Sequence, residues 1–124
     1  FYGRRAMNTR AIGNAGEDMA CEYLKKRGWT IVDRNVRCGR NEIDIIARKR
    51  RLTAFIEVKR RKSADFGRPA EAVNRDKQAR IVRAAAIYLQ ENDMPDAQVR
   101  FDVIEILPGE IRHIEDAFDA SNYI

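Results

Sequence analysis

Two apolar stretches that carry charges in their middle, NEIDIIA at residues 41–47 and FIEVK at residues 55–59, decide how this sequence folds. Both are short, apolar and bounded by polar segments, which predicts two β-strands in a buried sheet. Burying an unpaired carboxylate is expensive, so buried charges usually neutralise one another or hold a metal ion. Charges inside both strands therefore indicate a functional site and not a solvated surface.

The spacing places four of these charges together. Side chains alternate between the faces of a strand, so Glu42 and Asp44 share one face, and Glu57 and Lys59 share one face. The segment between the strands, residues 48–51, is too short and too charged for a helix, which predicts an antiparallel hairpin. With the turn centred in that segment, Asp44 faces Glu57 and Glu42 faces Lys59. The residues expected to point the other way, into the core, are Ile43, Ile45 and Val58.

Opposed carboxylates at this position favour a metal ion. Directly opposed residues have Cβ atoms about 4.5–5.5 Å apart. At that range two partly buried carboxylates repel each other by roughly 3–4 kcal/mol at an effective dielectric constant of about 20. A divalent cation between Asp44 and Glu57 removes this penalty. The alternative is a structural ion pair of Lys59 with Glu57 or Glu42, although two carboxylates and one lysine stay unbalanced.

Length and charge bound the class of protein. A chain of 124 residues has room for one domain. Its net charge of +5 includes two basic runs, residues 48–51 and 59–62, beside the acidic strands. Clustered cations next to carboxylates predict a polyanionic partner, and the alternative is that they only solubilise strand ends. The sequence has no stretch long enough to span a bilayer and no apolar N-terminal run, which predicts a soluble cytoplasmic protein. Cys21 and Cys38 match no zinc-binding spacing.

Periodicity along the chain predicts the order helix, three strands, helix, strand. The expected elements are helices over 11–27 and 75–89, strands over 29–33, 41–47, 55–59 and 99–106, a charged loop over 60–70, and a candidate edge strand over 111–114. A helix between the third and fourth strands permits a parallel crossover, so the expected fold is α/β with a mixed sheet flanked by helices. We expect one domain over 10–118, an N-terminal extension over 1–9 with a candidate native start at Met7, and a tail over 119–124.

This order, with Asp44 followed by the triplet Glu57, Val58 and Lys59, resembles the PD-(D/E)xK nuclease superfamily and its restriction-endonuclease-like core. The closer resemblance is to the YraN-like family, which is similar to archaeal Holliday-junction resolvases. The resembling residues are Gly16, Glu17, Ala20, Tyr23, Leu24, residues 42–47 and 55–59, Lys77, Gln78 and residues 100–104. The sequence departs from the family at Asn41, where glycine is usual, but it keeps the acidic residues.

The resemblance implies a metal-dependent active site. Asp44, Glu57 and the backbone carbonyl of Val58 are the expected ligands of Mg²⁺ or Mn²⁺, because these ions prefer oxygen ligands. The ion would activate a water molecule and polarise the scissile phosphate. Lys59 is expected to orient that water and to offset charge in the transition state. Glu42 is either a third acid of the site or a partner of Lys59.

Further residues take candidate roles from the resemblance, each with a plainer alternative. Glu17, in the first helix, is a candidate additional ligand or base, or else a solvent-exposed acid favoured by the helix dipole. Lys77 and Gln78 open the second helix and could reach phosphate or water, or else form ordinary polar surface. The expected nucleic-acid contacts are Arg48, Lys49, Arg50, Arg51, Arg60, Arg61, Lys62 and Lys77.

The expected function is a metal-dependent endonuclease that hydrolyses phosphodiester bonds in DNA and recognises structure more than sequence, as a Holliday-junction resolvase does. One alternative is a nucleic-acid-binding module with a nuclease fold and little or no cleavage. Another is an RNA-processing nuclease. A resolvase needs two active sites, so a homodimer would favour that role.

Overall fold

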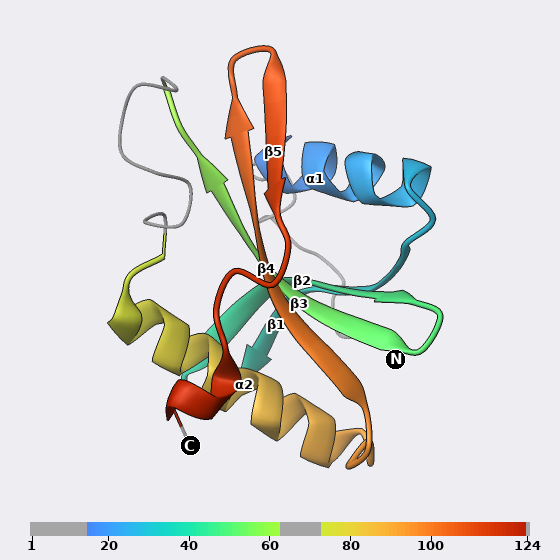
Figure 1. The fold of residues 1–124 in the computed structure, drawn as a ribbon, viewed down its shortest axis with the longest axis vertical. Helices are drawn as coiled ribbons and strands as arrows, with labels where there is room; N and C mark the ends of the chain where they lie inside the picture. The colour runs from blue at the N-terminus through green and yellow to red at the C-terminus, as the bar shows by residue number, and fades with distance from the viewer. Residues whose placement is uncertain (1–14, 63–72, 124) are drawn as a thin grey trace.

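Five strands in the order β1-β2-β3-β4-β5 form one mixed sheet flanked by two helices (Figure 1). The computed structural model describes residues 15–62 and 73–123. Its elements are α1 (Ala15–Lys26), β1 (Thr30–Cys38), β2 (Asn41–Lys49), β3 (Leu52–Arg60), α2 (Arg75–Glu91), β4 (Gln98–Leu107), β5 (Glu110–Ile114) and the 3₁₀ helix η4 (Ala120–Tyr123). β3 and β4 are parallel, and the other neighbouring strands are antiparallel. The predicted α/β class is confirmed, and the candidate edge strand is β5.

The sheet buries a hydrophobic cluster on each face. On one face α2 packs over Phe55 and Phe101, whose rings stack with centroids 5.7 Å apart. On the other face α1 packs through Leu24 against Ile45 and Ile56. Because β3 is covered on both faces along its middle, a charge on this strand must find a partner or lie near a strand end.

The β2–β3 hairpin has the predicted register. Ile45 pairs with Ile56, and Lys49 pairs with Leu52 across a two-residue turn. Two arginines are unusual in such a turn, and Arg50 takes the left-handed conformation that it requires, with φ of 57°. The paired ladder ends at Ile45 and Ile56. The next residues along each strand, on the side away from the turn, are the two predicted metal ligands.

Strict alternation fails at Ile43, so the prediction that Ile43 points the same way as Ile45 is wrong. Ile45 packs in the α1-side cluster, whereas Ile43 packs in the α2-side cluster together with Cys38. The reason is that the end of the β1–β2 hairpin lies over α2, where a Cβ at Gly39 would be 3.3 Å from Ile87. This hairpin end and α2 together bound one side of the candidate site.

The observed element boundaries mostly follow the predictions. β1 continues beyond the predicted 29–33 to Cys38, because an edge strand tolerates charged side chains such as Arg34. α2 begins after Asn74, whose side chain accepts a hydrogen bond from the backbone N–H of Lys77. The tail contains η4, which packs on α2. The predicted extension over 1–9, the start of the first helix and most of the loop over 60–70 lie outside the described residues.

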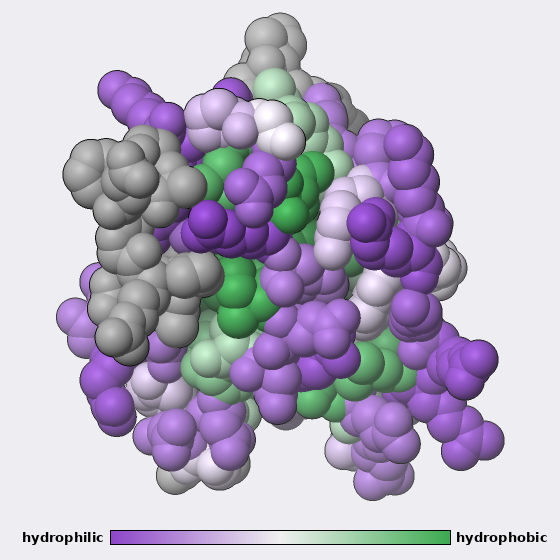
Figure 2. Space-filling model, turned by 45° about the horizontal axis from the view of Figure 1, so that its top comes forward, coloured by the Kyte–Doolittle hydropathy of each residue, from purple (hydrophilic) through white to green (hydrophobic). Residues whose placement is uncertain are grey.

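Hydrophilic side chains dominate the face seen in Figure 2, and apolar atoms are visible mainly in the gaps between them. Among the described residues, the large hydrophobic side chains that are exposed are Met19 and Val32. In the same part of the chain, no helix combines the length and the apolar character needed to cross a membrane. We therefore expect a binding site to be formed by charged side chains.

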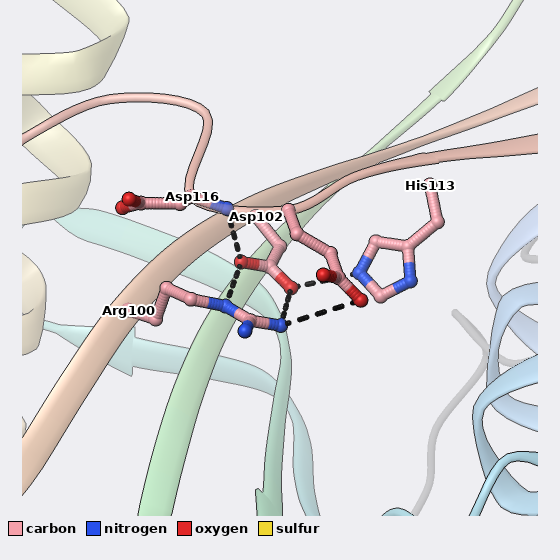
Figure 3. A network of polar contacts seen from close by, with 5 residues as sticks. Arg100, Asp102, His113 and Asp116 are labelled. Carbon is pink, nitrogen blue, oxygen red and sulfur yellow. Dashed lines mark hydrogen bonds and ion pairs between the residues drawn. The ribbon is translucent and has the colours of Figure 1, made fainter.

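A buried polar network joins β4, β5 and the turn that follows (Figure 3). Asp102 is fully buried, and its carboxylate accepts two hydrogen bonds of 2.9 Å from the Arg100 guanidinium. It also contacts His113 Nε2 at 2.7 Å and accepts a hydrogen bond from the backbone N–H of Asp116 at 3.0 Å. Burial raises the pKa of Asp102, but the hydrogen bonds from His113 and Arg100 outweigh it and hold that pKa below its usual range. This carboxylate is fully satisfied and structural.

We predict that Asp102→Ala lowers the free energy of unfolding by about 3–5 kcal/mol, because it leaves the partly buried charge of Arg100 with only the 3.8 Å ion pair to the exposed Glu115. Urea denaturation at neutral pH measures this loss. The control is Glu110→Ala, which breaks the exposed ion pair with Arg112 and should cost less than about 1 kcal/mol. Equal losses in the two variants would contradict the structural role of the network.

Candidate metal centre

The two predicted metal ligands lie side by side where β2 separates from β3. Asp44 and Glu57 follow the last residue pair of the ladder, and their carboxyl groups share a hydrogen bond. Asp44 Oδ2 also accepts a hydrogen bond of 2.8 Å from the backbone N–H of Val58. The Asp44 side chain therefore takes the place of a backbone partner at the fork, which fixes its orientation.

Burial and mutual repulsion dominate the electrostatics of this acid pair, Asp44 and Glu57. Burial raises the pKa of Asp44, and hydrogen bonds from Val58 and Glu57 oppose that rise. Burial first, and the charge of Asp44 second, raise the pKa of Glu57 to about 7. The pair therefore holds a shared proton through much of the acidic range.

The cation that contacts the acid pair comes from α2. Lys77 Nζ lies 3.5 Å from Glu57 Oε2, and the positive charge of Lys77 lowers the pKa of both acids. Lys59 also lowers the pKa of Glu57, by less than Lys77 does. The sequence suggested an ion pair of Lys59 with Glu57 or Glu42 as an alternative. In the structure, the lysine that forms an ion pair with Glu57 is Lys77. Glu42 lines the cleft beside Asp44 and raises its pKa further.

Glu17 is buried, so the alternative of a solvent-exposed helix acid is wrong. Only 9% of Glu17 is exposed, and burial followed by the charge of Asp44 raises its pKa. Arg34 Nη2 lies 3.6 Å from Glu17 Oε1, and Asn35 donates a hydrogen bond to the Glu17 carboxylate. Glu17 Oε1 is buried without a hydrogen-bond partner among the described residues. Glu17 is therefore a third acidic group whose charge interacts with that of Asp44, and Arg34 and Asn35 hold it in place.

The donor set fits a hard divalent cation. Asp44 and Glu57 offer carboxylate oxygens, and Mg²⁺ is commonly bound through one or two carboxylates with water completing its shell. Within residues 15–62 and 73–123, no three Asp, Glu, His or Cys side chains are grouped closely enough to hold a metal ion by themselves. Glu17 therefore lies outside the set of direct ligands in this conformation, and its Oε1 lies 3.6 Å from Arg34 Nη2.

The amide of Gln78 is used within the fold. Its Nε2 donates a hydrogen bond of 2.9 Å to the Val73 carbonyl, and its Oε1 accepts one of 2.6 Å from the Tyr123 hydroxyl. Gln78 thus ties the start of α2 to η4. Its predicted catalytic role would require one of these hydrogen bonds to be exchanged.

Apart from Lys77, which lies on α2 at the acid pair, the predicted nucleic-acid contacts fall into two places. Arg48, Lys49, Arg50 and Arg51 are exposed at the hairpin tip, between clefts of about 550 and 740 Å³. In the second run Arg60 and Lys62 are exposed, and the stem of Arg60 lies against Gly16 of α1. Arg61 Nε donates to the buried carboxylate of Glu105, so Arg61 has a structural partner.

The structure adds residues that the sequence reasoning missed. Arg40, Arg80 and Arg83 line a cleft together with Asp44 and Lys77. The sequence pattern that could have identified Arg80 and Arg83 is their spacing of three residues from Lys77 onwards, in a helix that was predicted to begin at residue 75. The contacts of Arg34 and Asn35 with Glu17 could not be predicted from the sequence, because the predicted first strand ended at residue 33.

Comparison with known proteins gives the family. The sequence model described as Uncharacterised protein family UPF0102 matches residues 16–106. The chain is 46% identical to a UPF0102 protein of Dictyoglomus thermophilum over 101 residues, covering 82% of this chain and 86% of the relative. It is 45% identical to a UPF0102 protein of Geotalea daltonii over 122 residues, covering 94% and 96%. It is 44% identical to a UPF0102 protein of Nocardia farcinica over 119 residues, covering 92% and 94%. The matched region contains the acid pair, α1 and α2, and the chain therefore belongs to the UPF0102 family, the YraN-like family that its sequence resembles.

Proposed function

We propose that this protein is a Mg²⁺- or Mn²⁺-dependent endonuclease that hydrolyses phosphodiester bonds in DNA. The observation that carries the proposal is the acid pair at the fork of β2 and β3, in which Glu57 is buried and Asp44 is half-buried. Two buried carboxyl groups in contact destabilise a fold unless a cation or a proton compensates them. Strongly perturbed carboxyl groups of this kind are typical of functional sites, and oxygen ligands favour a hard divalent ion.

The acid pair would hold the ion, with the backbone carbonyl of Val58 as a third oxygen. The bound ion would activate a water molecule and polarise the scissile phosphate. Asp44 keeps its orientation through the Val58 amide. Glu57, with a pKa of about 7, must lose its proton to become a ligand, so binding of the cation is favoured above neutral pH.

Two lysines and Glu17 complete the proposed mechanism. Lys77 neutralises Glu57 in the free protein and can turn to a substrate phosphate once Glu57 binds a cation. Lys59, two residues beyond Glu57 on β3, would orient the attacking water and offset negative charge in the transition state. Glu17, whose charge interacts with that of Asp44, would add negative charge beside the bound cation.

A branched DNA substrate fits the distribution of positive charge. Arg60 and Lys62 follow the site directly, whereas the hairpin tip is about seven strand residues, or some 20 Å, from Asp44. That distance suits contact with a separate arm of a junction, and a homodimer would present two sites to such a substrate. The cytoplasm, where DNA is accessible, is the proposed location. Cleavage of RNA, or binding without cleavage, are the alternatives that the cleavage experiment below separates.

We predict that the metal-free protein loses stability as pH rises from 4.5 to about 7, the range in which folded Glu57 keeps a proton that the unfolded chain has lost. The loss at Glu57 is at most about 3 kcal/mol. Glu57→Gln should remove most of this slope, whereas the exposed control Glu22→Gln should keep it. Urea denaturation in chelator across this pH range measures it. Identical slopes in all three proteins would show that Glu57 is not held protonated.

We predict that the protein with Mn²⁺ or Mg²⁺ cleaves labelled DNA, and branched or flapped DNA faster than plain duplex. Lys59→Ala should bind DNA nearly as well as wild type but cleave it on the order of 10²–10³-fold more slowly, because Lys59 acts in the transition state. Asp44→Asn should lose both metal and cleavage, and Lys26→Ala on α1 is the control. Cleavage of RNA alone would favour the RNA nuclease. Wild-type rates in Asp44→Asn would refute the site.

A further inference from the structure

A row of cations runs along α2 beside the acid pair. Lys77, Arg80 and Arg83 recur at every third position, so they lie along one flank of the helix. Lys77 is half-buried at the acid pair, and Arg80 and Arg83 are exposed. The core side of α2 is formed by other residues, such as Val82 and Ala85. The row therefore leads from the acid pair out along the helix surface.

This row forms one wall of a cleft. A cleft of about 620 Å³ lies between α2 and the end of the β1–β2 hairpin. Arg40 lines it from the hairpin, Arg80 and Arg83 line it from α2, and Asp44 and Lys77 line it from the candidate metal centre. Four cations thus share one concave surface with two carboxylates, Asp44 and Glu42. The two clefts at the hairpin tip are lined by neither Asp44 nor Glu57.

Among the described residues, the three arginines of this cleft take no part in the ion pairs that hold the fold together. None of the ion pairs between described residues involves Arg40, Arg80 or Arg83. By contrast, Arg61 and Arg100 are paired with the buried carboxylates Glu105 and Asp102. Exposed guanidinium groups without carboxylate partners, placed around a concave site, raise the local concentration of an anionic ligand.

We infer that this cleft is the path by which a single nucleic-acid strand enters the acid pair, with its phosphates held by Arg40, Lys77, Arg80 and Arg83. The inference rests on the proposed function and adds the route and strandedness of the substrate. From Lys77 to Arg83 the helix rises about 9 Å, enough for about two consecutive phosphates of an extended strand. A cleft of about 620 Å³ between α2 and the hairpin end is too small to enclose a duplex, so we expect a single strand to occupy it.

The test compares two double variants that remove equal charge from the two helices. Arg80→Ala/Arg83→Ala changes the proposed path, and Lys25→Ala/Lys26→Ala changes the last turn of α1. Affinity for a short fluorescent oligothymidylate is measured by anisotropy against salt concentration, in chelator so that no cleavage occurs. The first variant should flatten the slope of log affinity against log salt by up to about 1.4 and weaken binding about 20-fold at 0.1 M salt. The second should bind as wild type does.

Two further measurements sharpen the result. Arg80→Lys/Arg83→Lys keeps the charge and should restore most of the salt slope, which excludes misfolding as the cause. A fully paired duplex of equal length should lose less affinity than the single strand in the alanine variant. An unchanged slope in the alanine variant, or a larger loss for duplex than for single strand, would overturn the inference.

The inference and the proposed function can fail separately. If Arg80→Ala/Arg83→Ala binds normally while the wild type still cleaves DNA with Mn²⁺, the strand path is wrong and the nuclease assignment stands. If the variant loses binding while the wild type never cleaves with either ion, the strand path stands as the binding groove of a protein without nuclease activity.

Discussion

Two carboxyl groups that are forced together at the fork of β2 and β3 are the constraint on which the rest of the site depends. β3 is held along its whole length by parallel pairing with β4, from Leu52 to Arg60, so Glu57 cannot withdraw. β2 pairs with β3 only from Ile45 onwards, and at the preceding residue the Asp44 side chain accepts a hydrogen bond from the Val58 backbone N–H. Each strand is therefore fixed by bonds that do not involve the repulsion between the two acids.

Two of the buried carboxyl groups in the sheet, Asp102 and Glu57, have surroundings that shift their pKa values in opposite directions. Asp102 is surrounded by donors, and its pKa lies below the usual range. Glu57 has Asp44 beside it, and its pKa rises to about 7 although Lys77 lies within ion-pair distance. The first arrangement is complete without a ligand, whereas the second is left short of positive charge. That difference distinguishes a structural network from a site that can gain a cation.

The sequence was sufficient to predict what depends on local pattern. The short segment of residues 48–51 determined the hairpin register, and alternation placed Asp44 near Glu57. It could not predict what depends on how elements pack. The contact of Lys77 with Glu57 arises because α2 crosses the sheet at this point, and the position of Ile43 follows from the hairpin end lying over that helix. The partner of Arg61, Glu105, is far away in the sequence, so a basic run appeared to be wholly available for binding.

A calorimetric titration of Mn²⁺ into the wild type, Asp44→Asn and Glu57→Gln tests directly whether the acid pair is a cation site. At pH 8 the wild type should bind Mn²⁺ at one site, and both variants should lose that binding. Below the Glu57 pKa of about 7 the wild type should bind more weakly and release a proton as it binds. A cation site at the acid pair is contradicted if the wild type binds no Mn²⁺ at pH 8, or if both variants bind Mn²⁺ as tightly as the wild type does.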